Sequence, residues 1–289
     1  MDFAVQRCCI TPVFAKAYDI STDAILKEFN INFLDIKGFG CCGYPLKNIS
    51  YKSSILASAR NLALAEKDNR NIITVCNCCY EHLKSSNIKI REDSSLKDEI
   101  NASLQLEGLE YSGNIEVKHI IEVLYEDIGI ERINEKVKKR FDDLKIAVHY
   151  GCHIQRPKSL FPDDEPPIPA MFDEIIELTG VTAIDWETQK QCCGSPMLGI
   201  DDKLSTDLMD KKLIDARNFG AECICVACAY CQVQFDKSQK IMLSERNTGS
   251  GVPSILFTQI LGLSLGIDGK KLGTDSNEIN LDRILGSLR

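Results

Sequence analysis

The sequence predicts an α/β fold built from two copies of one unit. Three observations lead to this prediction: a cysteine pattern that occurs twice, apolar runs that alternate with helical periodicity around each copy, and a length of 289 residues, which suits about two domains. We expect each copy to be a small doubly wound unit with a parallel sheet, and the two units to be related by pseudo-twofold symmetry. The first is predicted at residues 1–140, with a connector at about 84–143, and the second at 144–289.

The repeated pattern consists of a lone cysteine, a vicinal pair followed by glycine, and a Cys-x-x-Cys motif. The gaps between these parts are 31 and 33 residues in the first copy and 39 and 34 in the second. Ten of the fourteen cysteines belong to the pattern, five per copy: Cys9, Cys41, Cys42, Cys76 and Cys79, then Cys152, Cys192, Cys193, Cys228 and Cys231. The segment Ala59-Arg60-Asn61 also recurs, as Ala216-Arg217-Asn218. Such self-similarity indicates an internal duplication.

The predicted elements follow the same order in both copies. Each copy opens with a buried parallel strand that ends near its lone cysteine, at Phe3 to Val5 and at Lys145 to Tyr150. In the first copy a helix, strand, helix and strand are then expected at 19–29, 31–35, 54–66 and 72–75. In the second they are expected at 169–178, 181–185, 205–218 and 223–226. Because ligands collect at the carboxyl ends of such strands, the three cysteine groups of each copy should converge there.

The remaining segments carry weaker signals. Residues 84–110 are polar and lack a strong period, and the charge-rich stretch 131–143 predicts a solvated connecting helix. The apolar stretches 120–125 and 259–265 predict packed helices after each Cys-x-x-Cys motif.

Charge and composition exclude several classes of protein. A net charge of −8 argues against nucleic-acid binding, which relies on basic surface. The longest apolar segment, Ile255 to Ile267, falls short of the ~20 residues of a membrane span, and no signal peptide precedes the first strand. No GxGxxG fingerprint occurs, so we expect neither flavin nor nicotinamide in this chain. These features predict a cytoplasmic protein whose cysteines stay reduced and serve in metal binding or catalysis.

Several kinds of cysteine chemistry are compatible with a repeated pattern. Structural zinc uses four ligands, usually from two knuckles, and a thiol-disulfide enzyme needs only one Cys-x-x-Cys motif. An iron-sulfur centre fits better, because adjacent thiolates can reach different irons or bridge two of them. Four cysteines lie outside the pattern and are expected to be packing residues: Cys8, Cys78, Cys223 and Cys225. Of these, Cys78 lies between two proposed ligands.

At these motifs the sequence resembles the CCG-domain proteins, and among them the B subunits of methanogen heterodisulfide reductases. The segments Gly151 to Pro157 and Thr258 to Gly262 also resemble that family. Two features depart from it: Cys8 stands where glycine is usual, and Thr11 to Phe14 lacks a common arginine. Related chains of lactate, glycerol-3-phosphate, succinate and sulfur oxidation systems carry CCG domains too.

The resemblance implies a catalytic subunit with two noncubane [4Fe-4S] clusters, each bound by the five cysteines of one copy. Its reaction would reduce the mixed disulfide of coenzyme M and coenzyme B to two thiols, with one cluster on each side of the sulfur–sulfur bond. Electrons would come from two partner chains of a heterodisulfide reductase, the iron-sulfur C subunit and the flavin-bearing, electron-bifurcating A subunit, with an associated hydrogenase or formate dehydrogenase. The alternative is an electron-transfer subunit of a sulfur- or lactate-oxidising complex.

Side chains near the motifs are candidates for proton transfer and substrate binding. His153, next to Cys152, is the best-placed histidine for protonating a leaving thiolate, and a hydrogen bond to the cluster or backbone is its alternative role. The substrate implied by the resemblance carries phosphate, carboxylate and sulfonate groups, which require cations. The candidates are Lys47, Arg60, Arg156, Lys158 and Arg217.

Overall fold

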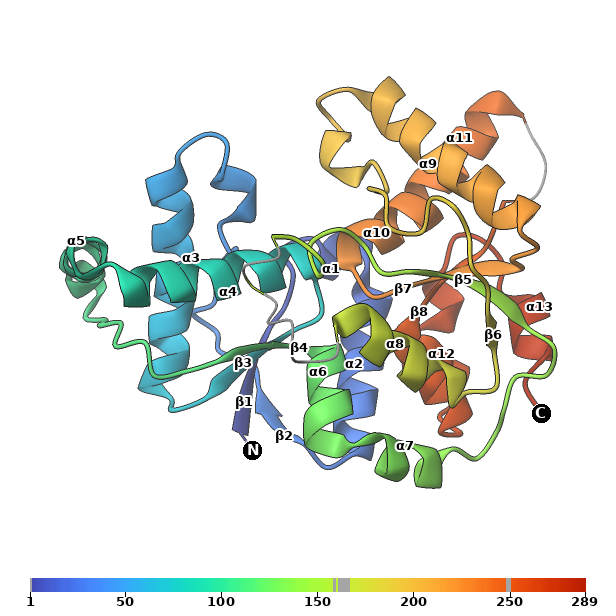
Figure 1. The fold of residues 1–289 in the computed structure, drawn as a ribbon, viewed down its shortest axis with the longest axis horizontal. Coiled ribbons are helices and arrows are strands. Elements are labelled where there is room, and N and C mark those ends of the chain that lie inside the picture. Colours follow the sequence, from blue (N-terminus) through green and yellow to red (C-terminus); the bar gives the residue numbers. More distant parts are fainter. Residues whose placement is uncertain (1, 158–159, 161–166, 248–250) are drawn as a thin grey trace.

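The protein contains two four-stranded sheets in which all strands are parallel, as the sequence predicts. The structure is a computed structural model that describes residues 2–157, 160, 167–247 and 251–289 (Figure 1). The first sheet has the order β2-β1-β3-β4, with strands β1 (Asp2–Gln6), β2 (Asn32–Leu34), β3 (Asn71–Thr74) and β4 (Val117–His119). The second has the order β6-β5-β7-β8, with strands β5 (Lys145–His149), β6 (Thr182–Ala183), β7 (Cys223–Val226) and β8 (Ser254–Leu256).

Both sheets are doubly wound. The chain steps outward from β1 to β2 and then crosses back to β3, so a topological switch point lies between β1 and β3. The first-half helices are α1 (Thr11–Phe14), α2 (Lys16–Glu28), α3 (Tyr51–Lys67), α4 (Asn77–Glu92), α5 (Ser94–Leu104), α6 (Ile120–Glu122) and α7 (Ile130–Lys136). The second-half helices are α8 (Ile168–Glu177), α9 (Asp202–Asn218), α10 (Ala229–Val233), α11 (Gln239–Arg246), α12 (Phe257–Ser264) and α13 (Asp282–Gly286). In the second sheet the same switch point lies between β5 and β7.

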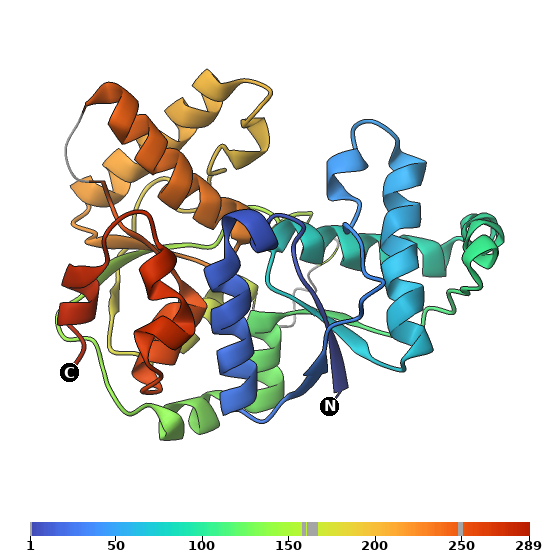
Figure 2. The same cartoon turned by 180° about the vertical axis from the view of Figure 1, so that it is seen from behind.

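The two halves share one core because each contributes helices to the other. Helix α2 packs against α12, and its counterpart α8 packs against α6. Figures 1 and 2 both show α2 beside the C-terminal helices. The ring of Tyr18 meets the ring of Phe257 edge-on at 6.4 Å, and the hydroxyls of Ser21 and Thr258 lie 2.6 Å apart. All four side chains are fully buried, so this contact is part of the core. The reciprocal packing agrees with pseudo-twofold symmetry.

The structure differs from the predicted elements in three places. Each sheet has a fourth strand, β4 or β8, which escaped prediction because it runs without a break into the apolar helix that follows it, α6 or α12. The polar segment 84–110 is largely helical, because α4 runs to Glu92 and α5 follows it. Helix α4 buries polar side chains such as His82, Ser86 and Asn87, so an apolar stripe does not mark its inner face. The expected connecting helix at 131–143 is only α7, which ends at Lys136.

Candidate metal centre

The predicted ligands lie at the carboxyl ends of the strands. In the first half Cys9 follows β1 and Cys76 follows β3, on the two sides of the switch point. In the second half Cys152 and Cys228 follow β5 and β7 in the same way. The vicinal cysteines lie in the loops after β2 and β6, directly before the short 3-10 helices Tyr44–Leu46 and Ser195–Met197.

The glycine after each vicinal pair has a steric reason. Gly43 has φ +94° and Gly194 has φ +89°, in the left-handed region that favours glycine. A Cβ atom on Gly43 would come within 2.2 Å of the Ser54 carbonyl oxygen, and one on Gly194 within 2.5 Å of the Ser205 carbonyl oxygen. The motif therefore lets the cysteine loop lie directly on the following helix.

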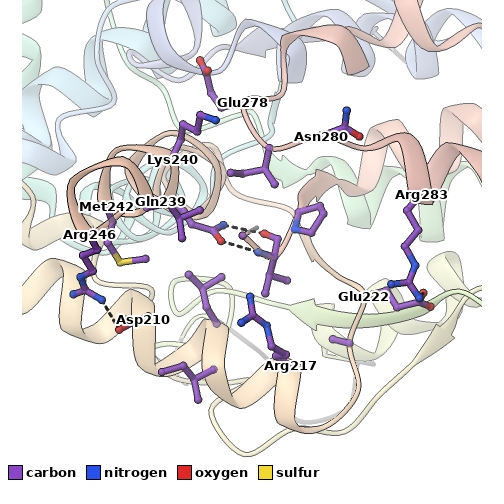
Figure 3. A pocket seen from close by; sticks show the side chains of 18 of the residues that line it. Asp210, Arg217, Glu222, Gln239, Lys240, Met242, Arg246, Glu278, Asn280 and Arg283 are labelled. Carbon is purple, nitrogen blue, oxygen red and sulfur yellow. Dashed lines mark hydrogen bonds and ion pairs between the residues drawn. The ribbon is translucent and has the colours of Figure 1, made fainter. Parts of the chain in front are cut away.

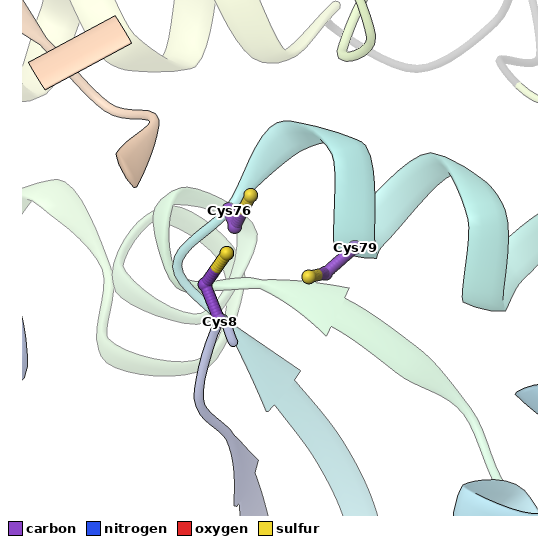
Figure 4. Close-up of side chains that lie close together, drawn as sticks. All are labelled: Cys8, Cys76 and Cys79. Carbon is purple, nitrogen blue, oxygen red and sulfur yellow. The ribbon is translucent and has the colours of Figure 1, made fainter. Parts of the chain in front are cut away.

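In the first half the five predicted ligands form one connected group of sulfurs. The thiols of Cys8, Cys76 and Cys79 lie within 4.8 Å of one another and point together (Figure 4). The thiols of Cys42, Cys41 and Cys9 extend this group, because each lies close enough to shift the pKa of its neighbour. Cys8, which the sequence suggested was a packing residue, is thus in contact with the group.

The second half assembles its five predicted ligands in the same order. The sulfurs of Cys193 and Cys231 are 3.5 Å apart. The thiols of Cys152 and Cys193 lie close enough to Cys192 to lower its pKa, and those of Cys193 and Cys228 lie close enough to Cys231 to raise its pKa. Cys223 and Cys225 lie outside this group, fully buried within β7.

The two groups meet rather than lying on separate faces. The sulfurs of Cys76, Cys78 and Cys228 lie within 4.8 Å of one another, which brings the two halves into direct contact. The Asn77 side-chain amide donates across the same boundary to the Tyr150 carbonyl at 2.7 Å. Cys78, which falls outside the repeated pattern, therefore stands at the junction of the two groups.

The close packing of the thiols strongly shifts their pKa values. Hydrogen bonds from Cys42 and Cys9 lower the pKa of Cys41 to about 2, and those from Cys152 and Cys193 lower the pKa of Cys192 to about 2. The pKa of Cys42 is raised, first by its bond to Cys41. So many adjacent sulfurs ionise together only when a multivalent cation neutralises them. More than four soft donors per group suit an iron-sulfur centre, whereas tetrahedral zinc takes four.

His153 lies between the two groups. Its Nδ1 is 3.2 Å from the sulfur of Cys152 and 3.6 Å from that of Cys78, in the opposite half. The ring packs edge-on against Tyr44, with 4.9 Å between the centroids. Burial lowers the pKa of His153, while the carboxylate of Glu81 opposes that shift. The side chain is thus held where both halves present a thiol.

The proposed cationic residues are scattered. Lys47 lies 3.4 Å from the buried carboxylate of Glu81, and its charge acts on His153. Arg60 forms an ion pair with Glu107. Arg156 is exposed on the loop after His153. Lys158 lies outside the described residues.

The structure does not bring Arg217 to the cysteines. This residue lines a cavity of about 1390 Å³ together with Glu222 and Pro253, which directly precede β7 and β8 (Figure 3). The cavity is therefore at the amino ends of these parallel strands, whereas the cysteines follow their carboxyl ends.

The recurrence of Ala-Arg-Asn is not a structural equivalence. The two glycines contact the carbonyls of Ser54 and Ser205, and these same carbonyls lie beside His82 and Gln234. Helices α3 and α9 therefore align at these serines. Seven residues further along each helix, Asn61 corresponds to Lys212 rather than to Asn218.

Sequence reasoning missed four residues close to the sulfurs. Two are the extra thiols of Cys8 and Cys78, whose adjacency to proposed ligands was the available signal. The third is His149, which has one ring nitrogen within 4.8 Å of the sulfurs of Cys193 and Cys231. The fourth is Lys212, which a polar helix pattern assigns to the surface and the fold buries.

Two facing groups of thiols on a duplicated, doubly wound α/β fold define a cysteine-rich protein suited to metal binding. The family model of the CCG cysteine-rich domain matches residues 3–84 and 146–236, and the chain belongs to that family.

Its relatives are subunits of redox complexes. The chain is 34% identical over 277 residues to the B subunit of a CoB-CoM heterodisulfide reductase from Methanosarcina acetivorans, covering 94% of this chain and 92% of that one. It is 32% identical over 276 residues to the B subunit of the ferredoxin:CoB-CoM heterodisulfide reductase from Methanosarcina mazei, covering 94% and 91%. It is 30% identical over 284 residues to the 8-methylmenaquinol:fumarate reductase membrane anchor subunit of Wolinella succinogenes, covering 98% and 99%.

A solved structure shares the fold. A hypothetical protein from Helicobacter pylori superposes with a TM-score of 0.74 at 16% identity, covering 96% of this chain and 51% of that chain. Among the helices in the described part of this chain, none combines the length and apolar character needed to cross a membrane.

Proposed function

We propose that this chain is the disulfide-reducing subunit of a heterodisulfide reductase, which converts the mixed disulfide of coenzyme M and coenzyme B into two thiols. The observation that carries the proposal is the meeting of the two thiol groups at Cys76, Cys78 and Cys228. A relay of electrons through the chain does not require two similar sites that face each other. Cleavage of a bond between two sulfurs does benefit from a site on each side.

Each cysteine group is proposed to hold one noncubane [4Fe-4S] cluster. The first would use Cys9, Cys41, Cys42, Cys76 and Cys79, and the second Cys152, Cys192, Cys193, Cys228 and Cys231. Bound clusters supply single electrons, and a disulfide takes up two electrons and two protons to give two thiols. Two sites in contact match this stoichiometry.

The chain's own residues handle protons and charge. His153 is proposed to carry a proton to a leaving thiolate, because its Nδ1 lies beside a thiol from each half. The ion pair of Lys47 and Glu81 lies close by, and Glu81 is only 3% exposed. Lys47 and Arg156, with Lys158 from outside the described residues, are the proposed contacts for the anionic ends of the substrate. The positions of Arg60 and Arg217 give those two candidates less support.

The proposed assembly follows the relatives. Electrons would reach this chain in the cytoplasm from the iron-sulfur C subunit and the flavin-bearing A subunit of the complex, linked to a hydrogenase or formate dehydrogenase. The similarity to B subunits supports membership of such a complex.

Anaerobic purification tests the proposal directly. We expect about eight irons and eight acid-labile sulfides per chain, and turnover of the mixed disulfide with a reduced viologen dye as donor. Saturation at four irons would contradict the two-cluster assignment. Zinc without sulfide would contradict the redox function altogether.

A second function is favoured by the Wolinella relative, whose similarity extends over 98% of this chain. In that case the chain would pass electrons within a different oxidoreductase complex. Clusters that are reduced and reoxidised by partner proteins, with no turnover of the mixed disulfide, would establish this alternative.

A further inference from the structure

A lysine is buried beside the second group of thiols. Lys212 on α9 is 1% exposed, its Nζ lies 4.3 Å from the centroid of the Trp186 ring, and it donates a hydrogen bond to the Thr188 carbonyl. Among the described residues no carboxylate forms an ion pair with it, and the carboxylate of Asp215 acts on it only from beyond ion-pair distance. Burial lowers its pKa to about 8, and the thiols of Cys231 and Cys193 oppose that shift. An ammonium group buried without a carboxylate is costly unless another negative group faces it.

A histidine with unsatisfied nitrogens faces the same thiols. His149 ends β5, is 1% exposed, and has a ring nitrogen within 4.8 Å of the sulfurs of Cys193 and Cys231. Neither buried nitrogen has a hydrogen-bond partner among the described residues, although the backbone of Gln189 is close enough to raise the pKa of the ring. An imidazole ring carries at least one N–H donor in either protonation state. That donor is available to a sulfur atom.

The first half has neutral amides at the equivalent positions. Gln6 ends β1 as His149 ends β5, and Asn61 corresponds to Lys212. The Gln6 amide donates to the Gly40 carbonyl at 3.0 Å, and the Asn61 amide donates to the carbonyls of Gly40 and Cys41 at 3.2 Å each. These side chains hold the cysteine loop and add no charge. The nearby Lys47 is offset by Glu81.

We propose that Lys212 and His149 make the metal centre of the second half easier to reduce than that of the first, so that the first electron to enter the chain resides there. The proposal rests on the two centres of the proposed function. A buried positive charge and an N–H donor stabilise the more negative, reduced state of a nearby centre. The step transfers one electron from a one-electron iron-sulfur or dye reductant, and no bond forms or breaks. Lys212 places a positive charge near the metal centre and His149 places an N–H donor there, so both are positioning residues rather than catalytic residues.

The test is a potentiometric titration of the fully loaded protein under anaerobic conditions, followed by electron paramagnetic resonance. We expect two one-electron steps in the unmodified chain. Lys212→Asn, which installs the residue of the first half, should lower the higher potential and leave the lower one in place. His149→Gln should lower the same step by a smaller amount. Lys211→Asn, the same change at the exposed neighbouring position, should leave both potentials unchanged.

Assignment of the steps to the halves uses ligand variants. Cys193→Ser should remove the higher step and Cys42→Ser the lower one. The inference is overturned if Lys212→Asn leaves both potentials unchanged while both centres are present, or if only the lower step moves. If Lys212→Asn fails to take up iron, His149→Gln decides, because an unchanged higher step in that variant would overturn the inference. Absence of two centres from the unmodified chain would instead refute the proposed function.

Discussion

The two halves of the molecule share their strands and their five cysteine positions, and they differ in what surrounds the sulfurs. The first half adds the thiols of Cys8 and Cys78, whereas in the second half a ring nitrogen of His149 lies within 4.8 Å of two sulfurs and the ammonium group of Lys212 is buried. The glycine that supports each vicinal pair is retained in both. The comparison teaches that the backbone geometry of the ligand loops is shared, while the electrostatic environment of each group is separate.

The largest expected effect comes from removing one group at a time. Cys42→Ser and Cys193→Ser should each lose about half the iron, because each removes a ligand of one proposed four-iron centre. The measurement is the iron and sulfide content per chain after anaerobic reconstitution. Cys225→Ser is the control, because this thiol is buried within β7 and outside the group. If the control loses half its iron and Cys193→Ser does not, the ligand assignment is wrong.

Loss of either metal centre should abolish turnover completely. If both centres act on one substrate, Cys42→Ser and Cys193→Ser should each abolish reduction of the mixed disulfide, although each retains the other centre. The measurement is the rate with a reduced viologen dye, normalised to protein. A Cys42→Ser variant that works at a near-normal rate would replace the symmetric mechanism with a relay.

The supporting glycines should matter equally in both halves. Gly43→Ala and Gly194→Ala should each reduce the free energy of unfolding by at least about 2 kcal/mol, from positive φ and contact with a helix carbonyl. Denaturant titration of the metal-free chain measures this. Gly40→Ala is the matched control, because a Cβ there meets nothing within 4 Å. Equal losses at Gly40 and Gly43 would contradict the steric explanation.

A pH effect on stability is expected from Asp236 in the second half. Burial raises the pKa of Asp236 to about 6, although the backbone amides of Glu278 and Ile279 donate to it. The folded state therefore binds more protons than the unfolded state between about pH 4 and 6. This contribution to stability is complete below pH 4, declines as the pH rises, and is lost above pH 6. Asp236→Asn should make that slope shallower in unfolding measurements on the metal-free chain, and an unchanged slope would contradict the assignment.

The smallest expected effect tests the extra thiol of the first half. Cys8 occupies the position that Gly151 has in the second half, directly before the lone cysteine. Cys8→Gly makes the halves more alike, and the iron content should stay near eight because the five proposed ligands remain. Loss of about four irons would show that Cys8 is itself a ligand.

Local patterns predicted the parts of the fold that carry the cysteines. The strands before Cys9, Cys76, Cys152 and Cys228 are short apolar runs that end shortly before these cysteines. A doubly wound topology brings the carboxyl ends of such strands together. Strands β4 and β8 escaped prediction because each continues directly into an apolar helix, so that no polar or turn residue separates strand from helix.

The surroundings of the sulfurs were less accessible from sequence. Lys212 belongs to a helix whose polar composition suggests solvent, and only tertiary packing against Trp186 shows that it is buried. The recurring Ala-Arg-Asn segment misaligned the two copies, since Asn61 corresponds to Lys212 and not to Asn218. Such errors arise because a three-residue match within two helices is compatible with several alignments of those helices. The contact of each glycine with a helix carbonyl is compatible with only one alignment.

The reciprocal packing of α2 on α12 and of α8 on α6 has a consequence for the origin of the molecule. A single copy of the unit would expose the faces that carry Tyr18 or Phe257, which are apolar and fully buried in this chain. A protein with one copy would therefore need a second molecule to cover those faces, as a symmetric dimer does. The sulfurs of Cys76 and Cys228 would then have met first across the interface of two separate molecules. Fusion of two such genes would make that encounter independent of protein concentration and leave each copy free to acquire its own charges.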